Sequence, residues 1–462
     1  MTSGPIPDEW LYLNLEDVTS HVTDGTHMPP PRKNQGVPLL SAQDVADGHL
    51  RLAGSRFVDE KFFEAELRRT KLAEGDVLLT IVGSIGRSTV VTIKPRFALQ
   101  RSVAVLKPRN VRSKYLSYFL RSPIAFDFYQ ERARGTAQSG MYLRDLKQLP
   151  VPVPPLRQQD LIVDAIQKIE AKRASALTHI ANARIAMERF RLAVLAAACS
   201  GRLTADWRGL AAHQDMNDVL GERELGAERK TRRGVAPNAP IDAAIADLDL
   251  PATWARITVS KALVLEALVD VKDGNHGSNH PKVGEFTAEG VPFIAANLVH
   301  DGRIDFENAP RLSGPPLQRL RIGFAEPDDV ILTHKGSVGR VAIADRPCVL
   351  TPQTTYYRCD PGLILPSYLA IYQESLYFYL QLAAEMSQTT RDFVPISDQY
   401  LLTLIIPPLD EQKEIVHRAT GMLELADGLL ARIEGASRRI ERSSQAVLAK
   451  AFRGELIQTT AG

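Results

Sequence analysis

The sequence contains one unit written twice, with a period of 253 residues. Residues 83–87 read GSIGR and residues 336–340 read GSVGR, and 336 − 83 = 253. The same offset joins the Pro-Pro-Leu triplet at 154–156 to the triplet at 407–409. Solenoid proteins repeat every ~20–50 residues, so each copy here must be a whole domain with its attachments. Two similar units on one polypeptide suit a ligand that has two parts.

Size and composition predict a soluble globular chain of about three domains. The 462 residues are 44% hydrophobic, which is enough for packed cores. The three cysteines show no CxxC spacing, so a reducing compartment is favoured, and we expect the cytoplasm. No apolar run approaches the ~18–20 residues of a membrane span. No membrane role is therefore predicted.

Positive charge is concentrated in one stretch of the first half. The formal net charge of +2 is too small to indicate nucleic acid by itself. Residues 77–126, however, contain no acidic residue and nine basic ones: Arg87, Lys94, Arg96, Arg101, Lys107, Arg109, Arg112, Lys114 and Arg121. This pattern predicts an anion-facing surface, and the alternative is a solvated basic face. In the second half the charge is weaker, because Asp345 and Asp360 accompany Lys335, Arg340, Arg346 and Arg358.

Each half is predicted to mix strands and helices. A segment with tryptophan is followed by an Asp-Gly-x-His loop, by a β-hairpin around the glycine loop, and by aromatic-rich buried helices. The loops lie at 24–27 and 273–276, the hairpins at 77–93 and 330–343, and the helices at 115–129 and 368–379. The two Asp-Gly-x-His loops are offset by 249 residues and not by 253, so the halves differ in length near the front. Such variable loops are where specificity is expected.

Apolar residues that step alternately by four and three predict a long helix in each half. The first run comprises Ile162, Ile166, Ile169, Arg173, Ala176, Ile180, Ala183, Met187, Phe190, Val194 and Ala197. The second comprises Ile415, Ala419, Met422, Ala426, Leu429, Ile433, Ala436, Ile440, Ser443, Val447 and Lys450. Only Arg173, Ser443 and Lys450 break the pattern. We expect the two helices to pair antiparallel and to space the globular units, although heptads more often indicate simple packing or oligomerisation.

The predicted fold class is α+β, with an internal pseudo-two-fold repeat. It has two mixed α/β globular domains separated by an antiparallel two-helix coiled coil. The expected segments are a first globular domain at 1–153, a first long helix at 154–201, a linker with short helices at 202–250, a second globular domain at 251–406 and a second long helix at 407–456.

The sequence offers no catalytic residues. No glycine loop ends in Gly-Lys-Ser/Thr, and no Asn/Asp-Pro-Pro-aromatic tetrapeptide of an adenine methyltransferase is present. Asp24 with His27, and Asp273 with His276, lack the further ligands that a metal site needs. Nothing marks a nucleophile and its base. We therefore expect neither catalysis nor a bound metal or cofactor.

The order of these motifs resembles the specificity (S) subunit of type I restriction-modification systems over essentially the full length. The similarity lies in the tryptophan openings, the Asp-Gly-Thr-His loop, residues 76–87, and LPVPVPPLRQQ at 149–159. The second half departs from the first, with DEQ at 410–412 for RQQ at 157–159, and SQTTR at 387–391 for RGTAQ at 134–138. Such differences imply that the two domains read unlike DNA sequences.

The resemblance implies a non-catalytic subunit that recognises double-stranded DNA. Each globular unit would be a target recognition domain for one half of a bipartite, gapped site. The long helices would set the spacing and bind two modification subunits, which carry S-adenosylmethionine and methylate adenine, and a restriction subunit would also join. The competing hypothesis is a coiled-coil adaptor or scaffold without sequence-specific DNA binding.

The predicted DNA contacts belong to the loops and hairpins of both halves. Arginines at the hairpins suit phosphate or guanine, and glutamines suit adenine. A tight turn with an exposed arginine, or a loop side chain that caps its own turn, are the structural alternatives. The predicted residues are Thr26, His27, Ser84, Arg87, Lys94, Arg96, Gln100, Arg101, Arg134 and Gln138 in the first half, and Asn275, His276, Lys335, Ser337, Arg340, Gln353, Thr389 and Arg391 in the second.

Overall fold

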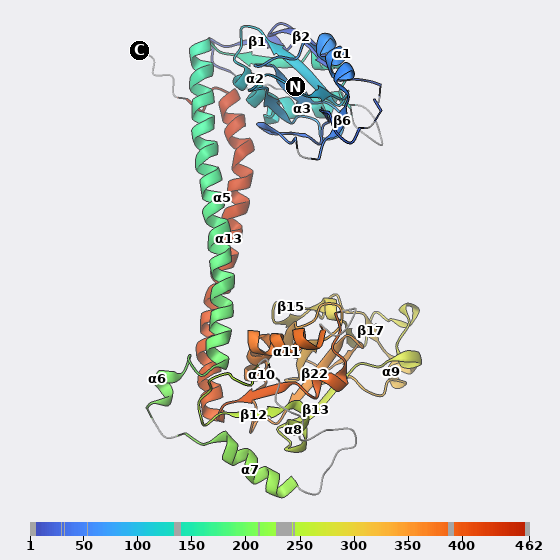
Figure 1. The fold of residues 1–462 in the computed structure, drawn as a ribbon, viewed down its shortest axis with the longest axis vertical. Coiled ribbons are helices and arrows are strands. Elements are labelled where there is room, and N and C mark those ends of the chain that lie inside the picture. The colour runs from blue at the N-terminus through green and yellow to red at the C-terminus, as the bar shows by residue number, and fades with distance from the viewer. Residues whose placement is uncertain are drawn as a thin grey trace. The chain divides into compact units, whose positions relative to one another are not determined.

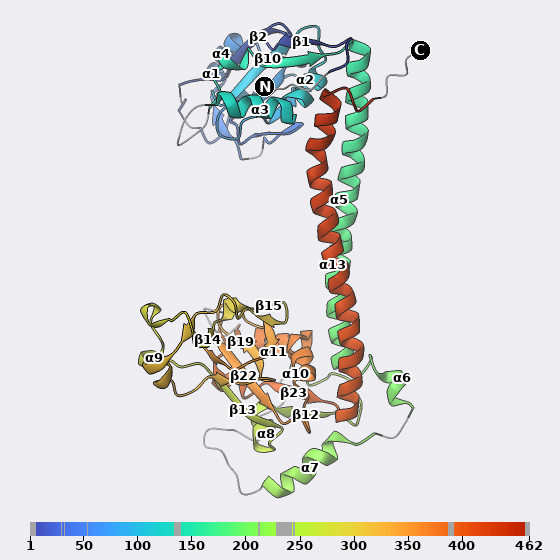
Figure 2. The same cartoon turned by 180° about the vertical axis from the view of Figure 1, so that it is seen from behind.

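The computed structural model divides the chain into two compact units. The first is Met1–Asn182 with Ile433–Gly462, and the second is Ala183–Arg432. Each unit contains one globular repeat and a portion of both long helices (Figures 1 and 2). The structure describes residues 6–28, 30–31, 33–52, 54–133, 140–210, 213–227, 243, 245–386 and 392–457.

A four-stranded antiparallel sheet is the centre of the first globular repeat. Its order is β2 (Thr19–Asp24), β10 (Val103–Pro108), β7 (Val77–Thr80), β8 (Ser88–Val90). Strands β7 and β10 are buried on both faces, so they read as continuous apolar runs. Alternate side chains enter different cores, because the strand period is two: Val77 and Leu79 face the helices, whereas Leu78 faces the smaller sheet.

Smaller elements surround this sheet. Helices α2 (Ser113–Leu120) and α3 (Pro123–Arg132) supply one core, and a three-stranded sheet with α1 (Glu60–Thr70) lies on the other side. The remaining elements are β1 (Leu11–Asn14) paired with β11 (Pro150–Val153), β4 (Val45–Ala46) paired with β5 (His49–Leu50), the sheet β6 (Arg56–Val58), β3 (Val37–Leu40), β9 (Ala98–Leu99), and α4 (Leu143–Leu146).

The central sheet of the second repeat has the same strand order as that of the first. This sheet runs β13 (Leu268–Asp273), β22 (Thr354–Cys359), β19 (Val330–Thr333), β20 (Val341–Ile343). The other sheets are β17 (Arg311–Leu312), β14 (Val291–Ile294), β21 (Cys348–Leu350), β18 (Phe324–Ala325); β12 (Ala255–Thr258) with β23 (Thr403–Ile406); and β15 (Val299–His300) with β16 (Arg303–Ile304). The helices are α8 (Val259–Val264), α9 (Gly314–Gln318), α10 (Pro366–Glu374), α11 (Leu376–Met386) and α12 (Ile396–Gln399), with short 3-10 turns Gly277–Asn279, Val283–Glu285 and Ala296–Leu298.

Both predicted hairpins and both predicted helical regions are confirmed. Strand β7 pairs antiparallel with β8, and β19 pairs antiparallel with β20. The aromatic segments form α2 and α3 in the first unit and α10 and α11 in the second. Local sequence patterns were enough for these elements, because the spacing of apolar residues and the glycines of the turn define a hairpin within a few residues.

The long helices are α5 (Leu156–Cys199) and α13 (Leu409–Phe452), and they contact each other antiparallel within each unit (Figures 1 and 2). In the first unit Ile166 shares a core with Leu448, whereas Arg173 bonds Ile440. In the second unit Arg191 pairs with Asp427. Arg191 comes after Arg173 on α5, whereas Asp427 comes before Ile440 on α13, as an antiparallel arrangement requires.

Two residues that break the heptad pattern have the same partner. The guanidinium of Arg173 donates to the carbonyl of Ile440 through Nε and Nη2, at 3.2 and 3.1 Å, and Ser443 Oγ donates to the same carbonyl at 2.7 Å. These polar side chains therefore satisfy a shared acceptor in the seam, and an apolar pattern cannot reveal such an arrangement.

The predicted register of α13 is wrong over one stretch. Met422 and Leu429 are exposed, and their neighbours Leu423 and Leu430 are partly buried in their place. Both residues of each adjacent pair are apolar, so either one satisfies the sequence pattern. An α-helix has 3.6 residues per turn, so its buried face drifts relative to a strict seven-residue repeat. On α5, Phe190 is likewise 37% exposed although it falls on a predicted seam position.

Each long helix begins on its own repeat through one repeated glutamine. Gln159 donates to the carbonyl of Pro154 at 2.9 Å and accepts from the amide of Arg112 at 2.8 Å. Gln412 makes the equivalent bonds, to Pro407 at 2.9 Å and from Leu365 at 2.8 Å. The Pro-Pro-Leu-x-x-Gln motif is therefore a junction between domain and helix.

Each long helix ends in the core of the other repeat. Leu448, Ala451 and Phe452 of α13 are buried in the first unit, and the ring of Phe452 lies edge-on to Tyr115 at 5.2 Å and Phe119 at 5.3 Å. Val194, Leu195, Ala198 and Cys199 of α5 are buried in the second unit. Neither globular core is complete without a helix end contributed by the other half of the sequence.

The region predicted as a linker, 202–250, contains α6 (Ala205–Arg208) and α7 (Met216–Ala227). Around α6, Thr204 Oγ1, Arg208 Nε and the indole Nε1 of Trp254 all donate to the buried carboxylate of Glu411, at 2.7 to 3.0 Å. Met216 on α7 enters the core of the second unit. Part of this region is thus integrated into the fold. Residues 211–212, 228–242 and 244 lie outside the described residues. No helix in the described part of the chain is long and apolar enough to cross a membrane.

Removing the ring of Phe452 should destabilise the first unit. We expect Phe452→Ala to lower its free energy of unfolding by about 3–5 kcal/mol, because a buried aromatic side chain leaves a cavity. Phe190→Ala, on an exposed side chain of α5, is the matched control and should cost less than about 1 kcal/mol. Urea denaturation of both variants measures this. Equal losses would contradict the closure of the first core by α13.

Candidate nucleic-acid interface

The two Asp-Gly-x-His loops are held by backbone contacts. In the first unit the amide of Thr26 donates to Leu99 at 2.7 Å, and the amide of Arg101 donates to Thr26 at 3.0 Å. A Cβ atom on Gly25 would overlap the carbonyl of Leu99, and one on Gly274 would overlap the carbonyl of Leu350. Glycine is therefore required at both positions for close approach of two backbones. The loops have a fixed course.

Each loop carries a histidine that binds the aspartate three residues before it. His27 Nε2 lies 2.8 Å from Asp24 Oδ2, and His276 Nε2 lies 2.7 Å from Asp273 Oδ2. The histidine side chains are 65% and 58% exposed, whereas the aspartates are 13% and 10% exposed. Each aspartate thus fixes an outward-facing ring.

The residue between glycine and histidine has a structural task in both loops. Thr26 Oγ1 donates to the carbonyl of Met28 at 3.0 Å and accepts from its amide, which closes the turn. Asn275 is buried: its Oδ1 accepts from the amide of Arg321 at 2.7 Å, and its Nδ2 donates to Ile322. The side chain of Asn275 thus faces inward and is satisfied there, and a DNA contact at this position stays a prediction.

The glycine loops are preformed by one threonine. Thr80 Oγ1 donates to the carbonyl of Ser84 and accepts from the amide of Arg87 at 3.0 Å. Thr333 does the same for Ser337 and Arg340, where the amide distance is 2.9 Å. Gly83, Gly86, Gly336 and Gly339 all have positive φ angles, and a Cβ atom added to Gly86 would lie only 3.1 Å from the ring of Tyr129. The turn is the same in both units.

The arginine side chains of the two glycine loops are only partly available to contact DNA. Arg340 is exposed, but its Nη1 donates to the carbonyl of Val299 on β15 at 3.3 Å. Arg87 is partly buried at the equivalent position. Ser84 is exposed and Ser337 is partly buried, and their backbone carbonyls accept hydrogen bonds from Thr80 and Thr333. The structure therefore supports a turn-forming role for these residues beside any contact with an anion.

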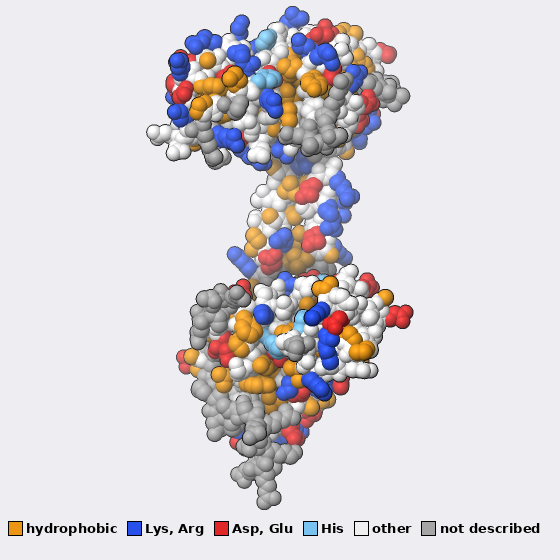
Figure 3. Space-filling model, turned by 90° about the vertical axis from the view of Figure 1, so that its right-hand side faces the viewer, with side chains coloured by type: hydrophobic (Ala, Val, Ile, Leu, Met, Phe, Trp, Pro, Cys, Tyr) orange, Lys and Arg blue, Asp and Glu red, His pale blue; other side chains and the backbone are white. Residues whose placement is uncertain are grey.

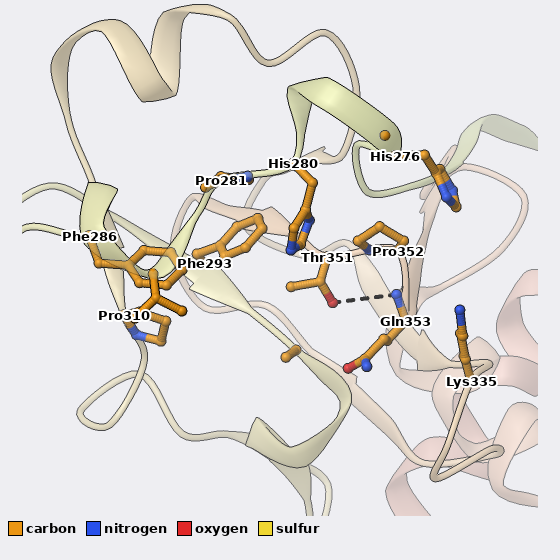
Figure 4. Close-up of a pocket in the computed structure, with 13 residues that line it drawn as sticks. His276, His280, Pro281, Phe286, Phe293, Pro310, Lys335, Thr351, Pro352 and Gln353 are labelled. Carbon is orange, nitrogen blue, oxygen red and sulfur yellow. Dashed lines mark hydrogen bonds between the residues drawn. The ribbon is translucent and has the colours of Figure 1, made fainter.

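In the second unit a hollow of about 580 Å³ brings three predicted residues together. His276, Lys335 and Gln353 come from separate loops and line one side, whereas Phe286, Phe293 and Pro310 line the other (Figure 4). Lys335 Nζ also lies 5.4 Å from the ring centre of Phe393. The hollow thus offers positive and hydrogen-bonding groups beside an apolar wall. The lining residues are His276, Gly277, His280, Pro281, Val283, Phe286, Phe293, Ala295, Pro310, Lys335, Thr351, Pro352 and Gln353.

Sequence reasoning missed His334, which lies directly before Lys335 and is buried. Its Nδ1 lies 3.0 Å from the carbonyl of Val394. Burial lowers the pKa of His334, and the positive charges of His276 and Lys335 act in the same direction. An uncharged imidazole therefore supports the loop from beneath. The equivalent position in the first unit, Ile81, gives no signal because it is apolar.

The first unit assembles its loops in the same way. Thr26 forms a bridge with Gln100, and the amide of Ile81 donates to Ser102 at 2.9 Å. The Asp-Gly-Thr-His loop, the Gln100–Arg101 segment and the start of the glycine loop are therefore neighbours. Arg101 and His27 are both exposed there. Histidine side chains with lysine and arginine around them are visible on one face of each unit (Figure 3).

Other predicted residues lie away from these loops or outside the described part of the chain. Lys94 and Arg96 follow β8 at the open end of the hairpin, where the amide of Val91 bonds the carbonyl of Asp76. Arg96 pairs with Glu60 at 3.4 Å. The structure does not join these two residues to the glycine loop. Arg134, Gln138, Thr389 and Arg391 lie outside the described residues.

Within residues 77–126, predicted to form an anion-facing surface, five of the nine basic side chains bond groups of the protein. Lys107 binds Asp76 at 2.7 Å, Arg112 binds Asp160 at 2.9 Å, and Arg121 lies 3.8 Å from Glu170 with its side chain 10% exposed. Arg96 and Arg109 also bond groups of the protein. The carboxylates come from outside the segment, so a count within the segment could not reveal them.

The chain is similar to proteins of known families. The family model of the type I restriction modification DNA specificity domain matches residues 7–185. The specificity subunit of the type I restriction enzyme EcoBI from Escherichia coli is 23% identical over 98% of this chain and 87% of its own length. The StySPI specificity subunit from Salmonella potsdam is 22% identical over 99% of this chain and 91% of its own. Residues 7–185 thus match the specificity-domain model, and the chain is similar over nearly its whole length to type I restriction enzyme specificity subunits.

Solved structures of this specificity-subunit family show the same fold. A chain in a structure of the assembly and conformational transition of the type I R-M system has a TM-score of 0.60, with 18% identity, over 98% of this chain and all of that chain. The HsdS subunit from Thermoanaerobacter tengcongensis has a TM-score of 0.50 and 19% identity, with the same coverage. The α+β class with two repeats and long helices is thereby confirmed.

A methyl group on Gly274 should disturb the second Asp-Gly-x-His loop. We expect Gly274→Ala to cost about 1–3 kcal/mol of unfolding free energy, because its Cβ would overlap the Leu350 carbonyl. Gly284→Ala is the control, because a Cβ atom added there would have no other atom within 4 Å. Thermal and urea unfolding of the two variants compare them. A neutral Gly274→Ala would mean that the backbones are not in close contact there.

Proposed function

We propose that this chain acts as the DNA-recognition subunit of a type I restriction-modification complex and is itself non-catalytic. Each globular unit reads one half of a bipartite, gapped site in double-stranded DNA. The observation that carries the proposal is the paired loop constellation. A fixed Asp-Gly-x-His loop, a glycine loop and a glutamine segment are assembled in the same way in both units. The similarity to specificity subunits indicates what such a pair of loop sets recognises.

The second unit contacts its half-site through the hollow beside Lys335. The ammonium group binds a phosphate, because backbone contacts supply most of the affinity of protein–DNA complexes. Gln353 accepts a long bond of 3.4 Å from the amide of Ala296, which leaves its NH2 group for an acceptor on a base. The apolar wall of Phe286 and Phe293 faces apolar parts of the DNA.

The first unit reads a different half-site. The offset of 253 places Val82 where the second unit has Lys335, and His27 with Arg101 supplies its exposed polar groups. The backbone of the loops is shared, whereas the side chains differ. This is the arrangement expected when two related domains recognise unlike sequences.

The long helices bind two modification subunits and fix the spacing of the half-sites. Exposed apolar side chains on α13 support a docking role, at Met422 (38%), Leu425 (62%) and Leu429 (37%). A solvated helix has no need of three such residues at helical spacing. The proposed segments remain 1–153, 154–201, 202–250, 251–406 and 407–456. Adenine methylation from S-adenosylmethionine belongs to the modification subunits, cleavage belongs to a restriction subunit, and the complex works on DNA in the cytoplasm.

Mapping of methylated adenines tests this function directly. The chain is expressed with its modification subunit, and methylation is read by long-read sequencing. We expect one gapped motif, and replacement of residues 1–153 by the same domain of a relative should change only one half of that motif. Methylation of a continuous motif, or a change in both halves, would contradict two independent readers. Absence of methylation together with absence of DNA binding would favour the scaffold hypothesis.

The salt dependence of DNA binding should identify Lys335 as a phosphate contact. We expect Lys335→Gln to weaken binding and to reduce the slope of log K against log salt by about 1, because one fewer counterion is released. Arg346→Gln is the matched control, since Arg346 already pairs with Asp345 at 2.8 Å. Fluorescence anisotropy across salt concentrations measures both slopes. Equal slopes for the wild type and Lys335→Gln would remove Lys335 from the interface.

A further inference from the structure

The Asp–His pairs recur in both units although their surroundings differ. The loops are offset by 249 residues and not by 253, and the residue between glycine and histidine is Thr26 in one loop and Asn275 in the other. Nevertheless, the Nε2–Oδ2 distance is 2.8 Å in the first unit and 2.7 Å in the second. The backbone contacts of the glycines already fix the loops. Because each histidine side chain is more than half exposed, the pair adds little to stability.

The contact with aspartate determines what the other ring nitrogen can do. Nε2 of each histidine is engaged by the carboxylate, and among the described residues Nδ1 of neither ring has a protein partner. A neutral ring that donates from Nε2 to aspartate presents Nδ1 as an acceptor, which a phosphate cannot use. A protonated ring presents Nδ1–H as a donor. A carboxylate on one nitrogen and a phosphate on the other both favour the imidazolium.

We propose that Asp24 and Asp273 are positioning residues that hold His27 and His276 for protonation, and that each ring donates from Nδ1 to a DNA phosphate. DNA binding then takes up one proton per pair from the solvent. The inference rests on the proposed function, because it assigns the DNA backbone as the ligand of these loops. The proton passes from buffer or water to the imidazole, and no covalent bond is made or broken.

The neighbouring charges fit this assignment. Around His27 lie Asp24, Arg101, and Arg69, whose Nη2 donates to the carbonyl of Asp24 at 2.6 Å and whose Nε and Nη2 bind Glu66. Around His276 lie Asp273, His280, Lys335, and His334. A bound phosphate would compensate these cations, so we expect proton uptake to accompany DNA binding.

Proton uptake is measured by isothermal titration calorimetry. The chain in complex with its modification subunit is titrated with target DNA in buffers of different ionisation enthalpy, from pH 6.5 to 8.5. We expect uptake of up to about two protons per chain near pH 8, with affinity falling up to about tenfold per pH unit for each proton as the pH rises. At lower pH the uptake should diminish, because a larger share of the rings is then charged before binding.

Three variants separate this proposal from a purely structural role. Asp24→Asn with Asp273→Asn keeps an acceptor for a neutral ring but removes the charge, so uptake should fall towards zero while the fold is retained. His27→Gln alone should remove only the proton of the first unit. His21→Gln is the control, because His21 is exposed on β2 of the same unit and should leave the uptake unchanged.

The outcomes distinguish the inference from the function on which it rests. Specific DNA binding without proton uptake, or wild-type uptake in the double Asn variant, would overturn the proposal and leave DNA recognition intact. Failure of the complex to bind any DNA would overturn both. Uptake that is lost in the Asn and Gln variants but kept in His21→Gln would support it.

Discussion

The burial of each long helix end in the core of the other repeat is the contact on which the remaining structure depends. Phe452, the last residue of α13, packs against Tyr115 and Phe119 of the first repeat. Cys199, the last residue of α5, is buried with the core of the second repeat. Because each core needs apolar surface from the other half of the sequence, neither repeat can bury its own core alone. A duplicated sequence thereby becomes one protein in which each half completes a core of the other.

Different polar side chains satisfy backbone groups at the domain junctions and in the seam between the long helices. Gln159 and Gln412 satisfy backbone groups where each helix leaves its own repeat. Arg173 and Ser443 satisfy the carbonyl of Ile440 within the seam. The glutamines are buried and the seam residues partly buried, and all four bond backbone carbonyls of the protein, which favours this register. The Pro-Pro-Leu-x-x-Gln motif therefore serves the architecture.

Sequence reasoning succeeded where the cause of a structure is local. The hairpins at Gly83–Gly86 and Gly336–Gly339 follow from glycines that must adopt positive φ, and the long helices follow from apolar periodicity. It failed where distant segments decide. The partners of Lys107, Arg112 and Arg121 come from outside the basic segment, Asn275 is held by the backbone at 321–322, and the register of α13 depends on which of two adjacent leucines faces α5. The hollow at Lys335 arises from separate loops, and no spacing predicts it.

The loops combine a fixed backbone with variable side chains, which suits recognition of unlike half-sites by two copies of one fold. Hydroxyl-radical footprinting of the complex with its modification subunit on DNA that contains the target tests this most directly. The account predicts two protected tracts separated by a stretch of weaker protection, with the tract on one side lost when the first globular domain is exchanged. A single continuous tract that responds as a whole to this exchange would contradict it.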